Sequence, residues 1–121
     1  MEKETVDLRN LIMTIDEKKG LNASLALEFE CKLEVEDFNT LVKIINYAIN
    51  YITQLTDQQL QISLNASTRG GYVIAFTAST TKNEFPPISE QVQEALNRYQ
   101  ATIEKKGETG KYIQLLITFN Q

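Results

Sequence analysis

Histidine is absent from the 121-residue sequence. Without an imidazole, the chain by itself cannot supply a histidine phosphoacceptor, a Ser–His or Cys–His nucleophile pair, or a zinc site with histidine ligands. This absence excludes several large classes of enzyme for the chain acting alone.

Cysteine is nearly absent as well. The single cysteine, Cys31, cannot form a disulfide within the chain, and it lies in an alternating run that predicts a strand. A cysteine in such a run usually behaves as a small buried hydrophobe. We therefore expect no redox or nucleophilic role for it.

Long apolar runs and an excess of positive charge are also missing. No run approaches the roughly 20 apolar residues of a membrane span, and the charged start MEKETVDLRN lacks the apolar core of a signal peptide. A net charge of -4 and a pI near 4.9 argue against a nucleic-acid surface. The basic pairs Lys18-Lys19 and Lys105-Lys106 stand where helices should end, a place that the helix dipole favours. We expect a cytoplasmic protein without nucleic-acid partners.

The remaining composition is that of one ordinary domain. Hydrophobic residues make up 42% and charged residues 23% of the chain, and the length suffices for a single core. We expect one domain over residues 1–121.

Residues 7–20 predict a short helix, with Asp7 as N-cap and Gly20 just past the end. A strand is the alternative, because every second residue from Leu8 to Thr14 also fits an alternating pattern. The apolar residues at helical spacing are Leu8, Leu11, Ile12 and Ile15.

Residues 23–34, ASLALEFECKLE, predict one half-buried strand, since apolar and polar residues alternate. One face carries Leu25, Leu27, Phe29, Cys31 and Leu33, and the other carries Ala26, Glu28, Glu30 and Lys32. Glu28 and Glu30 resemble a paired carboxylate site, but a solvated strand face explains them as well.

Residues 36–55 predict a long helix packed on a sheet, because their apolar residues recur with helical period. At about 100° per residue, a polar group falls on the opposite side. The apolar stripe contains Phe38, Leu41, Ile45, Ala48, Ile52 and Leu55, widened by Ile44 and Ile49, and the polar side contains Asn39, Lys43, Asn46, Asn50 and Thr53.

Residues 59–67 and 72–80 predict two antiparallel strands joined at TRGG, whose glycines allow a tight turn. Beyond a loop that ends in two prolines, Ser89 is expected to cap a second long helix that closes at KKG. The near-continuous apolar run 111–119 predicts a strand inside the sheet. The expected buried face of the second long helix is Val92, Ala95, Leu96, Tyr99 and Ile103.

This order of elements predicts an α+β fold, a two-layer sandwich with a mixed or antiparallel sheet and helices on one face. Asn46 and Asn50, four residues apart, share one side of their helix. They fit two interpretations, ligands of a metal–nucleotide or a solvated stripe. Tyr47 and Tyr51 likewise fit either an adhesive aromatic edge or residues that shield the core.

The element order over residues 5–119, with VDLRNLI before a strand and NYAINYI on the long helix, resembles the ATP-binding domain of the GHKL superfamily. This superfamily includes sensor kinases, anti-sigma kinases and related ATPases. The resemblance implies the Bergerat fold, a mixed sheet with a cavity between the asparagine helix and the lid. It also implies that Asn46 and Asn50 stand in the N box, which holds magnesium and phosphates. Convergence of an unrelated α+β protein on this order is the alternative.

Other GHKL motifs are missing. Where the family carries Asp-x-Gly to bind adenine, this chain reads TASTTK, with Ala78, Ser79, Thr80 and Thr81. NEFPPISEQ replaces the second glycine-rich segment, and the lid is a short loop. Carboxylates near the following helix N-terminus would oppose a triphosphate. These carboxylates are Glu84 and Glu90.

Two hypotheses follow. The first is a non-catalytic protein-interaction or regulatory module of bacterial signalling, without a cofactor, derived from a histidine-kinase-like ATPase domain. The second is a weak magnesium-dependent ATP or ADP site or residual ATPase, with Asn46 and Asn50 as nucleotide ligands and Asn50 at the metal. The first expects a protein partner on the loop Thr80 to Pro87 and on Asn39, Lys43, Asn46, Tyr47, Asn50 and Tyr51.

Overall fold

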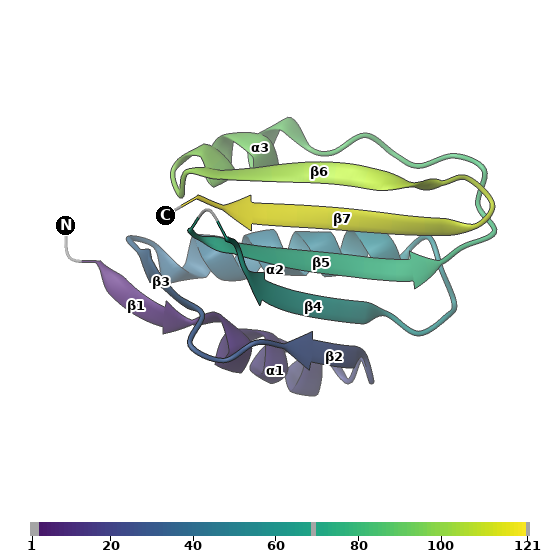
Figure 1. Cartoon of the computed structure of the whole chain (residues 1–121). Helices are drawn as coiled ribbons and strands as arrows, with labels where there is room; N and C mark the ends of the chain where they lie inside the picture. Colours follow the sequence, from purple (N-terminus) through teal and green to yellow (C-terminus); the bar gives the residue numbers. More distant parts are fainter. Residues whose placement is uncertain (1–2, 69, 121) are drawn as a thin grey trace.

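The computed structural model describes residues 3–68 and 70–120. A five-stranded sheet is covered on one face by a layer of helices, and a small two-stranded sheet lies beside it (Figure 1). In chain order the elements are β1 (Glu4–Asp7), α1 (Leu8–Lys19), β2 (Ser24–Leu27), β3 (Lys32–Val35), α2 (Phe38–Thr53), β4 (Gln61–Ala66), β5 (Tyr72–Ser79), α3 (Glu90–Asn97), β6 (Ala101–Glu108) and β7 (Tyr112–Phe119).

The large sheet is mixed, with strand order β2-β4-β5-β7-β6. β2 pairs with β4 in parallel, and the other neighbours are antiparallel. β7 lies inside the sheet, as its apolar run predicts, and the expected two-layer α+β sandwich is confirmed. β1 and β3 form the separate antiparallel pair.

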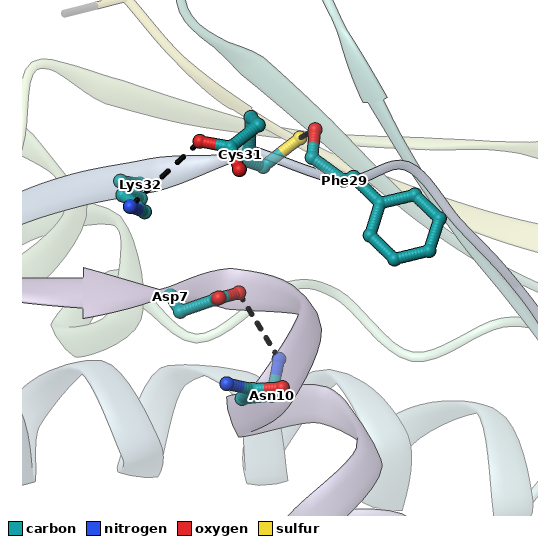
Figure 2. A network of polar contacts seen from close by, with 6 residues as sticks. Asp7, Asn10, Phe29, Cys31 and Lys32 are labelled. Carbon is teal, nitrogen blue, oxygen red and sulfur yellow. Dashed lines mark hydrogen bonds and ion pairs between the residues drawn. The ribbon is translucent and has the colours of Figure 1, made fainter.

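The first two predicted helices are confirmed, and the strand alternative for residues 7–20 is excluded. Asp7 accepts a hydrogen bond from the Asn10 amide at 3.2 Å (Figure 2), and Gly20 ends α1 with φ 61°. Asp37 caps α2 by accepting from the amide and hydroxyl of Thr40, and these bonds lower the pKa of its carboxyl. Both caps therefore satisfy free N–H groups of a first turn.

The core lies between the helices and the inner face of the sheet. The inward side chains of β4, β5 and β7 alternate with outward ones, and those of α1 and α2 follow the helical period. Among the fully buried members are Leu8, Ile12, Leu41, Ile45, Ile52, Leu64, Phe76, Leu115 and Phe119.

The prediction of one strand over residues 23–34 is wrong. The chain leaves the large sheet after Leu27, turns at Glu30 with φ 62°, and enters β3, which pairs with β1. Phe29, predicted to face the core, is instead 69% exposed, and its ring lies 4.3 Å from the Arg9 guanidinium carbon. The alternation continues through the turn, so it cannot show that the two halves have different pairing partners.

The predicted second long helix is also too long. α3 ends at Asn97, Gln100 reverses the chain with φ 53°, and residues 101–108 form β6 against β7. The Ser89 side chain makes no capping hydrogen bond. Pairing along β7 thus overrides a helical spacing that extended to Ile103. Lys105-Lys106 consequently lies in a strand, whereas Lys18-Lys19 lies in the last turn of α1 as expected.

None of the helices in the described ranges is long and apolar enough to cross a membrane.

The predicted hairpin of β4 and β5 is confirmed, and its turn depends on glycine. Gly70 and Gly71 have φ 89° and 81°, and Arg69 between the strands lies outside the described residues. A Cβ on Gly71 would lie 1.9 Å from the Phe119 carbonyl oxygen, whereas a Cβ on Gly70 would meet nothing within 4 Å. Of these two glycines, only Gly71 is therefore constrained by both backbone angle and space.

We expect Gly71→Ala to lower the free energy of unfolding by about 3 kcal/mol or more, because backbone strain is added to a backbone clash. The matched control Gly70→Ala should cost about 1 to 2 kcal/mol through the backbone angle alone. Urea denaturation of both variants measures the difference. Equal losses would contradict the close approach of Gly71 to Phe119.

Candidate functional site

All six residues predicted to bind a ligand or partner lie on α2, but the asparagines and the tyrosines contact different neighbours. The asparagine flank faces α1. There the Lys19 ammonium donates to Asn50 Oδ1 at 3.5 Å, and Asn46 is half-buried with its Oδ1 buried and unpaired among the described residues. Asn39 and Lys43 are exposed on the same side. The two asparagines are thus near α1 and not directed at the loop that follows β5.

A groove separates the asparagine flank from α1. It has a volume of about 270 Å³. We call it the α1–α2 groove, lined by Leu11, Thr14, Ile15, Lys18, Lys19, Phe38, Asn39, Val42 and Asn46.

The tyrosine flank of α2 holds the chain between β5 and α3, residues 80–89, which we call the β5–α3 segment. Tyr51 donates a hydrogen bond to the Pro86 carbonyl, and the Ser89 amide donates to the Tyr47 hydroxyl at 2.9 Å. The Lys105 ammonium donates to the same Pro86 carbonyl at 3.2 Å. These bonds tie the segment to both α2 and β6.

The tyrosines belong to the packed layer. Their ring centroids are 6.2 Å apart with the planes tilted by 44°. Tyr51 is 3% exposed, and burial, then the neighbouring Tyr47, raises the pKa of its hydroxyl. Phe85 and Ile88 of the β5–α3 segment pack against the same core. The position of the tyrosines therefore agrees with the core-shielding interpretation. The same two side chains also contact the β5–α3 segment.

A second cavity, of about 580 Å³, lies at the end of α2 and was not anticipated from the sequence. Thr80 is 5% exposed and donates its hydroxyl to the Leu55 carbonyl, while Thr56 donates to the Ser79 carbonyl. Lys111 on its wall is ion-paired with Glu108 at 3.2 Å. The cavity is lined by Gln54, Leu55, Thr56, Asp57, Gln58, Ser79, Thr80, Thr81, Lys82, Gly110 and Lys111.

The sequence holds one signal for this cavity, since Ser79, Thr80 and Thr81 belong to the TASTTK segment singled out above. That the turn between β6 and β7 also lines this cavity, through Gly110 and Lys111, follows only from the fold. Neither cavity is lined by the two tyrosines or by residues 83–89.

Glu28 and Glu30 have separate partners. Glu28 accepts a hydrogen bond from the Ala66 amide, and Glu30 pairs with Lys32 at 3.7 Å in an exposed position. Within residues 3–68 and 70–120, no group of three or more Asp, Glu or Cys side chains could hold a metal ion. The solvated-face interpretation of Glu28 and Glu30 agrees with these contacts.

Cys31 is fully buried, and its thiol donates to the Phe29 carbonyl at 3.7 Å (Figure 2). Burial, followed by the charges of Glu28 and Asp7, raises the pKa of this thiol. A raised pKa lowers the fraction of thiolate, the reactive form. The environment is that of the buried hydrophobe that the sequence predicts.

We expect Tyr47→Phe to loosen the β5–α3 segment, because the Ser89 amide loses its acceptor. A hydrogen bond worth about 1 kcal/mol corresponds to roughly five- to tenfold faster amide exchange at Ser89. The control Tyr112→Phe removes a hydroxyl from a residue that is 43% exposed. Hydrogen exchange resolved by residue measures both, and unchanged protection of Ser89 in Tyr47→Phe would contradict this contact.

No protein-family model matches the sequence, and no curated protein matches it significantly. Solved histidine kinase structures nevertheless share its fold. Full-length ShkA in complex with AMPPNP has a TM-score of 0.74 at 12% identity, over 99% of this chain and 31% of the ShkA chain. The histidine kinase domain of the E. coli osmosensor EnvZ has a TM-score of 0.73 at 10% identity, over 98% of this chain and 89% of that domain.

The nucleotide-free catalytic domain of the histidine kinase ThkA has a TM-score of 0.63 at 15% identity, with 98% of both chains covered. The chain thus spans nearly the whole ThkA catalytic domain but only about a third of the ShkA chain. The large sheet is mixed, because β2 and β4 are parallel. It is therefore not a simple antiparallel meander. The chain has the GHKL fold of histidine kinase catalytic domains.

Proposed function

We propose that this GHKL-fold domain is a non-catalytic protein-interaction or regulatory module of bacterial signalling. The observation that supports it is the attachment of the β5–α3 segment to α2 by Tyr47 and Tyr51. The resemblance expects a cavity between the asparagine helix and the lid, and here two aromatic side chains occupy the corresponding flank.

The residues in place of the adenine-binding motif support the same proposal. Ala78 is buried and has no polar side-chain atom, and the Thr80 hydroxyl is already bonded to the Leu55 carbonyl. TASTTK therefore offers no carboxylate to accept a hydrogen bond from a purine amino group. Glu84 and Glu90 flank the start of α3, where their charge would repel a triphosphate.

The exposed part of the asparagine flank is the surface that we assign to the partner. Asn39, Lys43 and Asn50 are exposed, and Asn46 is half-buried beside them. Tyr47 and Tyr51 then have a supporting role, since they fix the β5–α3 segment whose residues 81–84 are exposed. In this proposal, the domain works through its surface.

The partner surface is tested by capture from native cells with the double variant Lys43→Glu/Asn50→Ala as bait. Both side chains are exposed, so folding should be retained, while the captured partner should fall by about tenfold, a loss of about 1.4 kcal/mol in binding. The matched control is Lys106→Glu, an exposed charge reversal on β6. A partner captured equally by all three proteins would refute the assignment of this surface.

The second candidate is a weak magnesium-dependent ATP or ADP site, with Asn46 and Asn50 as ligands and Asn50 at the metal. It is favoured by the similarity to ShkA, whose structure was solved with AMPPNP, although neither asparagine lines the cavity beside TASTTK. In this candidate the domain senses or hydrolyses nucleotide.

A thermal-shift titration with Mg-ATP, Mg-ADP and Mg-AMPPNP separates the two candidates. A nucleotide at a hundredfold its Kd adds about 2.7 kcal/mol, which raises the Tm of a domain of this size by roughly 10 °C. We expect no shift up to millimolar nucleotide. A magnesium-dependent shift that Asn46→Ala/Asn50→Ala removes would establish the second candidate instead.

A further inference from the structure

The α1–α2 groove is the most apolar open surface beside the proposed contact residues. Leu11 and Ile15 are core residues of α1 and form its floor with the half-buried Val42 of α2. Phe38, at one end, is 37% exposed. An exposed aromatic beside an apolar floor is typical of a protein-binding surface.

The rim of the groove is basic, although the chain as a whole has a net charge of -4. Lys18 and Lys19 lie on the wall of the groove, at the end of α1. Across residues 3–68 and 70–120, the ion pairs join Glu30 to Lys32 and Glu108 to Lys111. In that part of the chain, Lys18 and Lys19 therefore have no carboxylate partner.

One polar atom in the wall of the groove also lacks a partner. Asn46 Oδ1 is buried and accepts no hydrogen bond in the described part of the chain. Because solvent does not reach this oxygen, it is not part of the open surface. The groove therefore offers apolar contact and positive charge.

The shape of the groove fits a helix. Asn39, Val42 and Asn46 line it at positions i, i+3 and i+7 of α2, a length of about 10 Å. Leu11, Thr14, Ile15 and Lys18 repeat the same spacing on α1. A third helix in a groove between two helices would contact both through anchors at i, i+3, i+4 and i+7.

We propose that the α1–α2 groove binds an amphipathic helix of a partner protein, with large aliphatic anchors on one face and Glu or Asp on the flank that lies over the end of α1. The carboxylates pair with Lys18 and Lys19. This assignment rests on the proposed function and names the class of partner that it requires.

Charge selects this occupant over two others. In a twofold dimer of this chain, the groove would face its own copy, whose lining contains lysines and no carboxylate to pair with them. A nucleic-acid backbone matches the charge but leaves the Leu11, Ile15 and Val42 floor without apolar contact. An acidic helix satisfies both the rim and the floor.

The test is a display library of 14-residue helical peptides with leucine at the four anchor positions and either Glu or Lys at each flanking position. We expect selection on the intact domain to enrich Glu at the flank that lies over Lys18 and Lys19. We also expect the amide shifts caused by a selected peptide to lie at Leu11, Val42 and Asn46. Enrichment of Lys, no enrichment at all, or shifts confined to the outer face of the sheet would overturn the proposal.

Variants supply the matched controls. Lys18→Glu/Lys19→Glu should weaken the selected peptide by about tenfold or more and bind its Lys-flanked counterpart instead, whereas Lys106→Glu, an exposed position on β6, should change neither. Equal affinity of all variants overturns the proposal, and so does a dimer in sedimentation that Val42→Lys dissociates. Nucleotide binding in the thermal titration would refute the proposed function while leaving the peptide result intact, so the two failures are distinguishable.

Discussion

Burial of the apolar stripe of α2 against the sheet is the interaction on which the rest of the structure depends. Leu41, Ile45, Ala48 and Ile52 are completely buried, and each large aliphatic side chain contributes about 1.5 to 3 kcal/mol when removed from water. This burial fixes the rotation of α2 about its axis. The rotation in turn directs the asparagines toward α1 and the tyrosines toward the β5–α3 segment, so that one flank is open and the other is closed.

The parts of the fold that were predictable from the sequence are those specified by local pattern. α1 and α2 carry their caps, Asp7 and Asp37, and their periodic apolar faces within a few turns. The errors occurred where pairing partners lie far apart in sequence. β3 pairs with β1 across more than twenty residues, so the strand that its alternation predicts belongs to a different sheet from β2. β6 is a strand because β7 lies beside it, although its segment alone predicts the end of a helix.

In the candidate site, too, the predictable features depend on local pattern and the others on distant parts of the chain. The helical wheel correctly separates Asn46 and Asn50 from the apolar stripe, because this depends on helix geometry alone. It cannot say which neighbour lies beside each flank, since that follows from the positions of α1 and the β5–α3 segment in the fold. The acceptor role of the Pro86 carbonyl for Tyr51 and Lys105 has no sequence signature, because any residue at that position carries the same backbone oxygen.

The interior position of β7 has a consequence for synthesis of the chain. β7 bonds to β5 on one edge and to β6 on the other, yet it is the last of these strands to leave the ribosome. Until residues 112–119 emerge, β5 has one bare edge and the nascent sheet stops at three strands. Such an edge is a template for association with other chains. We therefore expect the growing polypeptide to be prone to aggregation until β7 has emerged and completed the sheet.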